Sequence, residues 1–234
     1  MKKIINVYLL AADTLRSRAY VDILSKEKLK FEHAIIFGKK KYKKRHDLDN
    51  TLYNDDSLTE LLTKSGTEFT EINHSDINSI EIFNELKKIK KKYIVFAGMS
   101  GSILNKRILS LDHQFIHIHP GDLPDFRGST TIYYSLLKNG KITATAIFMN
   151  EKIDEGKIID KMDFEPPEDR STIDYSFDPL IRSKLLLKIM LNYLKKRKIN
   201  GNKQKGNGIT YHVIHPILKH IAILGKNKKK GIKI

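Results

Sequence analysis

The sequence contains no cysteine. It therefore cannot build a disulfide framework, a thiolate metal site or a cysteine nucleophile. It also has no apolar run near the roughly 20 residues that a membrane-spanning helix needs. Residues 1–10 carry two lysines and a short apolar stretch. That stretch is too short for a secretory signal, and we interpret it as a core strand. These absences predict a cytoplasmic protein.

The composition is that of a globular protein with a strong excess of positive charge. The 234 residues are enough for one substantial domain, alone or with a small appendage. The net charge of +16 fits either an anionic partner or a genome biased towards lysine, isoleucine and asparagine codons. We slightly favour the bias, because the lysine runs contain few of the arginines and aromatics of nucleic-acid surfaces. These runs are Lys39–Arg45, Lys87–Lys92 and Lys226–Lys230.

The first 120 residues alternate between apolar strands and helical patterns. The expected strands are Ile4–Leu10, His33–Phe37, Glu68–Ile72, Tyr93–Ala97 and Phe115–His119. The expected helices start after Asp13 or Thr14 and at Asp56, Asp76 and Ile103, and Lys39–Asp56 is expected to be a loop. This order predicts an α/β fold, a Rossmann-like and mostly parallel sheet with helices on both faces. Ligands of such sheets bind at the carboxyl ends of strands, where residues 98–101 and 117–121 are expected.

The rest of the chain divides at Pro166 and Pro167. Before them we expect a helix and two strands, and after them a long amphipathic helix, a flexible basic linker and a short end segment. These are Ser129–Lys138, Thr143–Met149, Lys157–Phe164, Leu180–Lys198, Gly201–Gly208 and Ile209–Ile234. We therefore expect one domain over residues 1–165, followed by a C-terminal helix and short extension over residues 166–234.

Two polar clusters interrupt this pattern. His117 and His119 are two apart in a strand, so their side chains share a face at the strand end. Such a pair fits metal ligands, paired catalytic groups or two ordinary polar residues. A metal needs further ligands, and although Asp122, Asp154 and His113 could be proposed, no known spacing supports them, so we expect no metal. The second cluster, residues 149–159, reads as a polar hairpin turn on spacing alone.

Three linked motifs give these clusters a common meaning. They are His117-Ile118-His119, then Leu123-Pro124-Asp125-Phe126-Arg127-Gly128, and later Asp154-Glu155-Gly156. Together they resemble the formyltetrahydrofolate-dependent formyltransferases, whose hallmark is Asn-x-His, Leu-Pro-x-x-x-Gly and Asp-x-Gly, and most closely the sugar N-formyltransferases. The resemblance covers roughly residues 93–159. It implies a Rossmann-like catalytic domain and N10-formyltetrahydrofolate as co-substrate.

The resemblance also implies a mechanism. A neutral amine attacks the formyl carbon, His119 and His117 stabilise the oxyanion, and Asp154 orients His119 and helps to move a proton. His117 stands where the family usually has Asn. This difference fits a working variant, a shift towards another reaction or a lost activity, and we favour the first because His119 and Asp154 are both present.

The resemblance further implies two binding surfaces. Folate would be bound by Met99, Ser100, Gly101, Ser102, Ile103 and Leu104, together with Asn150, Ile153 and Asp154. The acceptor would contact Gly121, Arg127, Ser129, Thr130, Tyr133 and Tyr134. The two tyrosines are suited to stacking on a base or sugar, unless one of them is part of the core. The motif at Tyr211–Pro216 is expected to be structural.

The acceptor follows from what the chain lacks. About 70 residues follow Phe164, too few for the tRNA-binding barrel of methionyl-tRNA formyltransferases. Residues 11–18 lack the glycine-rich phosphate loop of glycinamide ribonucleotide transformylases. Arg16 and Arg18 there could still meet an anion, although solvated helix arginines are the more common case and are what we expect. We therefore expect a nucleotide-linked amino sugar as acceptor, no nucleic acid or membrane partner, and leave a homodimer open. The alternatives are another formyl-transferring or formyltetrahydrofolate-hydrolysing enzyme, or an inactive basic protein that binds RNA.

Overall fold

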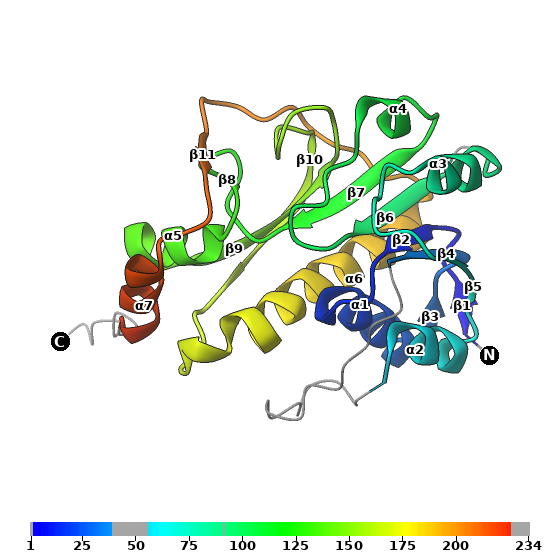
Figure 1. Cartoon of the computed structure of the whole chain (residues 1–234). Helices are drawn as coiled ribbons and strands as arrows, with labels where there is room; N and C mark the ends of the chain where they lie inside the picture. The colour runs from blue at the N-terminus through cyan, green and yellow to red at the C-terminus, as the bar shows by residue number, and fades with distance from the viewer. Residues whose placement is uncertain (1, 39–55, 91, 226–234) are drawn as a thin grey trace.

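A seven-stranded sheet runs through the molecule. The computed structural model describes residues 2–38, 56–90 and 92–225. In Figure 1 the sheet has the order β10-β9-β7-β6-β2-β4-β5. Its strands are β2 (Tyr8–Ala11), β4 (His33–Phe37), β5 (Glu68–Ile72), β6 (Tyr93–Ala97), β7 (Gln114–His119), β9 (Ile142–Phe148) and β10 (Ile158–Phe164). β9 is antiparallel to both of its neighbours, and the other pairs are parallel. The predicted α/β fold with a mostly parallel sheet is therefore confirmed.

Helices cover both faces of this sheet because its strands are apolar on both sides. Leu9 and Val95 pack in the larger core cluster, whereas their neighbours Leu10 and Phe96 pack in a second one. The larger cluster is covered by α1 (Leu15–Lys26), α2 (Leu58–Ser65), α5 (Thr131–Asn139) and α6 (Asp178–Lys196), and the second by α3 (Ile80–Lys87) and α4 (Lys106–Leu109). A 3-10 turn (Arg170–Thr172) and a π-helical turn (Ile173–Phe177) precede α6. No helix in the described residues is long and apolar enough to span a membrane.

The start of the chain differs from the prediction. The single strand expected over Ile4–Leu10 is wrong: β1 (Lys3–Ile4) and β2 are separate, because Asn6 between them adopts a positive φ of 56°. β1 pairs with β3 (Leu29–Lys30), which is too short to leave a sequence pattern. The predicted start of α1 is correct, since the Thr14 side chain caps it through a capping box with Ser17. The loop predicted at Lys39–Asp56 lies, apart from Asp56, outside the described residues.

The segment predicted as a flexible linker is held against the sheet, so that prediction is wrong. Asn202 pairs with Ile158 through two backbone hydrogen bonds of 2.8 Å. The chain then forms β11 (Ile209–Tyr211), which lies parallel to β8 (Phe126–Gly128). Figure 1 shows this orange segment beside β8, before α7 (Pro216–Leu224) packs near α5. Residues beyond 200 therefore return to the loops that follow β7.

Gly156 is required by a close approach between two backbone segments. A Cβ atom at Gly156 would lie 1.6 Å from the carbonyl oxygen of Phe148, so no side chain fits without moving the loop between β9 and β10. We expect Gly156→Ala to lower the free energy of unfolding by about 3 kcal/mol in urea unfolding followed by circular dichroism. Gly140→Ala is the control: it has open space and only a left-handed φ of 64°, and should cost about 1 kcal/mol. Equal losses in the two variants would contradict this role.

Candidate active site

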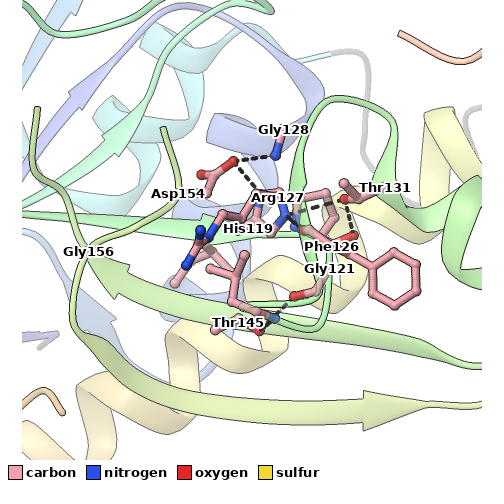
Figure 2. A network of polar contacts seen from close by, with 12 residues as sticks. His119, Gly121, Phe126, Arg127, Gly128, Thr131, Thr145, Asp154 and Gly156 are labelled. Carbon is pink, nitrogen blue, oxygen red and sulfur yellow. Dashed lines mark hydrogen bonds and ion pairs between the residues drawn. The ribbon is translucent and has the colours of Figure 1, made fainter. Parts of the chain in front are cut away.

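The three sequence motifs meet at the carboxyl end of β7. His117 and His119 lie in the last three residues of that strand, Gly128 ends β8, and Asp154 lies in the loop between β9 and β10. The Oδ2 atom of Asp154 is 3.4 Å from Nδ1 of His119 and accepts a hydrogen bond of 2.8 Å from the backbone N–H of Gly128 (Figure 2). Segments far apart in the sequence thus place one carboxylate against one imidazole.

The hydrogen bonds of His119 identify which ring nitrogen carries its proton. Nε2 lies 2.6 Å from the carbonyl oxygen of Phe126, and a carbonyl can only accept, so Nε2 is the donor. In a neutral ring Nδ1 then has a lone pair that faces the carboxylate of Asp154. Burial lowers the pKa of His119, and the charge of Asp154 opposes this shift. The contact between Nδ1 and Oδ2 becomes attractive once a proton lies between the two atoms. The His119–Asp154 pair is therefore suited to accept a proton.

Both nitrogens of His119 therefore face protein groups in this structure. No ring N–H of His119 is left to hold the predicted oxyanion, because Nε2 donates to Phe126 and Nδ1 faces Asp154. The predicted role of His119 in proton transfer is still possible, because Asp154 lies next to Nδ1. For the oxyanion, this leaves His117 among the residues predicted from the sequence.

Small residues fix the position of the His119 ring. A Cβ atom at Gly121 would lie 2.7 Å from Nε2 of His119, so a glycine at this position lets the backbone lie close to the ring. Substrate contact by Gly121 stays a prediction. Thr131 donates to the carbonyl of Pro120 at 2.8 Å and lies 3.4 Å from Nε2, and Thr145 donates to the carbonyl of Gly121 at 2.6 Å. Both threonines appear in Figure 2. Sequence reasoning missed them, because buried threonines carry no motif.

Gln204 holds the loop that carries Asp154. Its Nε2 donates to the carbonyls of Asp154 and Gly156 at 2.6 and 2.9 Å, and its Oε1 accepts from Arg127 at 2.9 Å. Two acceptor-only carbonyls and a donor-only guanidinium determine the orientation of this amide. Asp154 itself has a positive φ of 54°, a strained conformation that needs such support. No signal in the sequence pointed to Gln204, since it lies in the expected linker.

His117 is buried beside positive charge. Ile116 and Ile118 belong to the larger core cluster, so His117 and His119 share the other face of β7, as predicted. The ring centroids of the two histidines are 6.3 Å apart. Nδ1 of His117 has no hydrogen-bond partner among the described residues. Burial, followed by the charges of Arg16 and Arg182, holds the pKa of His117 well below its usual 6.5. The ring is therefore neutral at pH 7.

The arginines near the first helix are not solvated, contrary to the prediction. Arg16 donates to the carbonyl of Gly98, and Arg18 pairs with Asp13 at 2.6 Å. Burial lowers the pKa of Arg16, and Arg182 lowers it further. Arg16 therefore reaches the end of β6, where its charge acts on His117.

The two predicted folate segments approach each other near Lys106 and Glu151. Lys106, just after the first segment, lies 3.8 Å from Glu151 of the second, measured between Nζ and Oε1. Met99, Ile103 and Ile153 expose 41%, 56% and 50% of their surfaces, whereas Leu104 is part of the core. Exposed apolar side chains on both segments suit a flat, partly apolar ligand. Folate binding by these residues stays a prediction.

The predicted acceptor residues separate into two groups. Tyr133 is buried and its hydroxyl donates to Asp174 at 2.8 Å, so it is the tyrosine of the pair whose ring belongs to the core. Tyr134 is half-buried and its ring centroid lies 4.5 Å from that of Tyr211. Ser129 and Thr130 bond to the backbone at Tyr211 and Ile214, which places the C-terminal segment. Acceptor binding by the remaining residues is untested.

Comparison with known proteins identifies relatives of this site. The profile of the formyl transferase family matches residues 3–175. A methionyl-tRNA formyltransferase from Caldanaerobacter subterraneus is 30% identical over 166 residues, which are 67% of this chain and 53% of that protein. A methionyl-tRNA formyltransferase from Campylobacter jejuni is 29% identical over 132 residues, which are 56% of this chain and 42% of that protein. The chain thus spans about half the length of the curated relatives it matches.

Solved structures share the fold at low identity. A sugar N-formyltransferase from a Shewanella species superposes with a TM-score of 0.60 at 18% identity. The superposition covers 93% of this chain and 86% of the Shewanella chain. An N-formyltransferase from Helicobacter canadensis, in complex with folinic acid and dTDP-3-aminofucose, has a TM-score of 0.57 at 15% identity and covers 88% of this chain and 70% of its own.

The low pKa of His117 predicts a loss of stability in acid. The unfolded chain binds a proton at this residue below its usual pKa of 6.5, and the folded chain does not. The stabilisation is thus complete above pH 6.5 and falls as pH decreases. Between pH 6.5 and 5.5, the wild type should lose about 1 kcal/mol more than His117→Asn in urea unfolding. Parallel pH profiles would show that the ring is protonated in the folded state.

The hydrogen bonds of Gln204 predict that it orders the Asp154 loop. Gln204→Ala should raise hydrogen exchange of the amides in residues 150–156, with about 1–2 kcal/mol lost from their opening free energy. Lys205→Ala, an exposed neighbour, is the matched control and should leave exchange in that loop unchanged. Equal exchange in both variants would show that the loop does not depend on Gln204.

Proposed function

The chain belongs to the formyl transferase family, and from this we propose that it transfers a formyl group from N10-formyltetrahydrofolate to the amine of a nucleotide-linked amino sugar. The observation that carries the reaction type is the buried contact of 3.4 Å between His119 and Asp154 at the end of β7. It supplies a proton acceptor beside the crevice where sheets of this kind bind ligands.

In the proposed reaction the amine nitrogen bonds to the formyl carbon, and the bond from that carbon to N10 of the folate breaks. The amine loses a proton to the His119–Asp154 pair, where it lies between Nδ1 and Oδ2. The same proton then passes to the departing N10. Repulsion between the Nδ1 lone pair and the Asp154 carboxylate favours uptake of the proton from the amine. The positive charge of the protonated ring then favours its release to N10.

His117 takes the oxyanion role in this proposal. Its Nδ1 atom is buried and has no hydrogen-bond partner among the described residues, while the ring bonds to the backbone of Phe96 through its other nitrogen. A proton taken up at Nδ1 as the oxyanion forms would therefore be a free donor. Arg16 and Arg182 lie close enough to lower the pKa of His117, and their charge also favours an oxyanion nearby. The N–H formed at Nδ1 of His117 would thereby replace the amide N–H of the usual asparagine.

The folate and the sugar are supported by different observations. The exposed apolar residues Met99, Ile103 and Ile153 suit a pterin ring between the two facing segments. The structure from Helicobacter canadensis was crystallised with folinic acid and dTDP-3-aminofucose, and it shares this fold. Tyr134 and Tyr211 form an aromatic pair next to Gly128, whose N–H holds Asp154. A nucleotide base stacks well on such rings.

Methionyl-tRNA is the second candidate acceptor. The sequence relatives named above are methionyl-tRNA formyltransferases, and the net charge of +16 favours a polyanion. Against it, the arginines near the site, Arg16, Arg127 and Arg182, are engaged with protein groups. We therefore place the amino sugar first.

The test of the reaction is the variant Asp154→Asn, which keeps the shape and an acceptor for the Gly128 N–H but removes the charge. Turnover should fall by about 100-fold to 10,000-fold, while the urea midpoint and the affinity for a stable N10-formyltetrahydrofolate analogue change little. The measurements are single-turnover formyl transfer, urea unfolding and calorimetry. Equal losses of folding and activity would contradict the catalytic role.

The acceptor is tested by offering nucleotide-linked amino sugars and methionyl-tRNA to the same enzyme. We expect formylation of an amino sugar with a saturating KM and no salt-sensitive transfer to tRNA. Preference for tRNA, with a rate that falls steeply with salt, would replace the sugar as acceptor. Absence of folate binding in folded protein would exclude the reaction itself.

A further inference from the structure

Beyond formyl transfer, we propose that His117, His119 and Asp154 bind a divalent transition-metal ion of the Zn²⁺ type, and that the bound ion blocks formyl transfer. The metal site stands on the geometry of these three residues alone. The block rests on the function proposed above.

The three side chains are close enough to share one ion. One ligand atom from each lies within 4.8 Å of the other two. Bonds of about 2.0–2.1 Å at tetrahedral angles place two ligand atoms about 3.3 Å apart. Nδ1 of His119 and Oδ2 of Asp154 already stand at 3.4 Å, so this edge of the coordination sphere is formed. Small side-chain shifts of His117 would complete it.

The ligand set selects the class of ion. Two imidazoles and one carboxylate suit Zn²⁺ and its neighbours in the first transition row, rather than Mg²⁺ or Ca²⁺, which prefer oxygen ligands. Three protein ligands leave a fourth position open to water or to a substrate group. Asp122 and His113, also considered from the sequence, do not join the group, because Asp122 pairs with Lys161 at 2.5 Å and His113 contacts the Leu86 carbonyl at 3.0 Å.

The surroundings of the ligands match those of metal sites. A histidine that binds a metal through one nitrogen usually donates its other N–H to a carbonyl or carboxylate. His119 does so through Nε2 to Phe126, which leaves the Nδ1 lone pair directed at Asp154. Asp154 is held in turn by the Gly128 N–H at 2.8 Å. These bonds orient both ligands before any ion arrives.

Nδ1 of His117 supplies the independent observation. The atom is buried and no group in the described residues bonds to it, and a polar atom left in this state carries a substantial cost. Since the ring is neutral, the tautomer with its proton on the other nitrogen presents a lone pair here. Coordination to a cation would satisfy it. The asparagine that usually occupies this position in the family could not provide an imidazole nitrogen.

The nearby charges set the affinity. Arg16 and Arg182 oppose a cation, since both lower the pKa of His117. Asp178 partly neutralises Arg182 through an ion pair of 2.8 Å, and Asp154 supplies the negative charge at the ion itself. We therefore expect a reversible site rather than a permanently filled one. Once bound, the ion occupies the atoms that would receive the amine proton, which is why it blocks the reaction.

The experiment titrates Co²⁺ and Zn²⁺ into full-length protein freed of metal by a chelator. We expect binding of one Co²⁺ per chain, with the visible absorption of a low-coordinate site, and displacement by Zn²⁺. His117→Asn and Asp154→Asn should each weaken Co²⁺ binding by at least about 100-fold, because each removes a direct ligand. His212→Asn, which removes an exposed histidine away from the cluster, is the matched control and should bind as the wild type does.

The outcomes separate the two proposals. Circular dichroism of each variant, and chemical-shift changes of the wild-type histidine side chains with Zn²⁺, keep the test valid if a substitution disturbs folding. Absence of stoichiometric Co²⁺ binding, or equal binding by wild type and both ligand variants, would overturn the metal site while leaving folate binding and formyl transfer untouched. Metal binding without inhibition of formyl transfer by Zn²⁺ would overturn the block alone.

Discussion

The contact between Asp154 and the buried ring of His119 is the constraint on which the arrangement of this end of the molecule depends. The ring is fixed by the Phe126 carbonyl and by the close packing of Gly121, and the carboxylate is fixed by the Gly128 N–H. All of these contacts come from residues 121–128, the segment that follows β7. A carboxylate beside a neutral imidazole nitrogen is stable only if the surrounding backbone holds both in place, and the local structure does so.

Much of this fold could be predicted because the signals were local. Strands buried on both faces leave continuous apolar runs, and β4 and β6 were predicted residue for residue. The motifs around His119 and Asp154 could be found because their spacing is part of the chemistry. Asn6 shows the limit: its left-handed backbone divides an apolar run that looks like one strand. Tyr133 shows another, since core and contact tyrosines differ only in tertiary packing.

The contribution of the C-terminal segment could not be predicted from the sequence. Gln204 lies among glycines, lysines and asparagine, a composition typical of linkers, and its value comes only from two carbonyls about 50 residues earlier in the chain. β8 and β11 are three residues each and exist because they pair with each other. The burial of Arg16 is a similar case. Such long-range pairings leave no periodic pattern, although they decide the shape of the site.

The late position of Gln204 in the chain has a consequence for the order in which the site is completed during synthesis. The strands of the sheet from β2 to β10 all lie within the first 164 residues, and α6, which covers one face, follows them. The loop of Asp154 gains its hydrogen bonds to Gln204 only after that residue has left the ribosome. In the order of synthesis, the hydrogen bonds that hold the Asp154 loop thus come after the strands and the helix that position it.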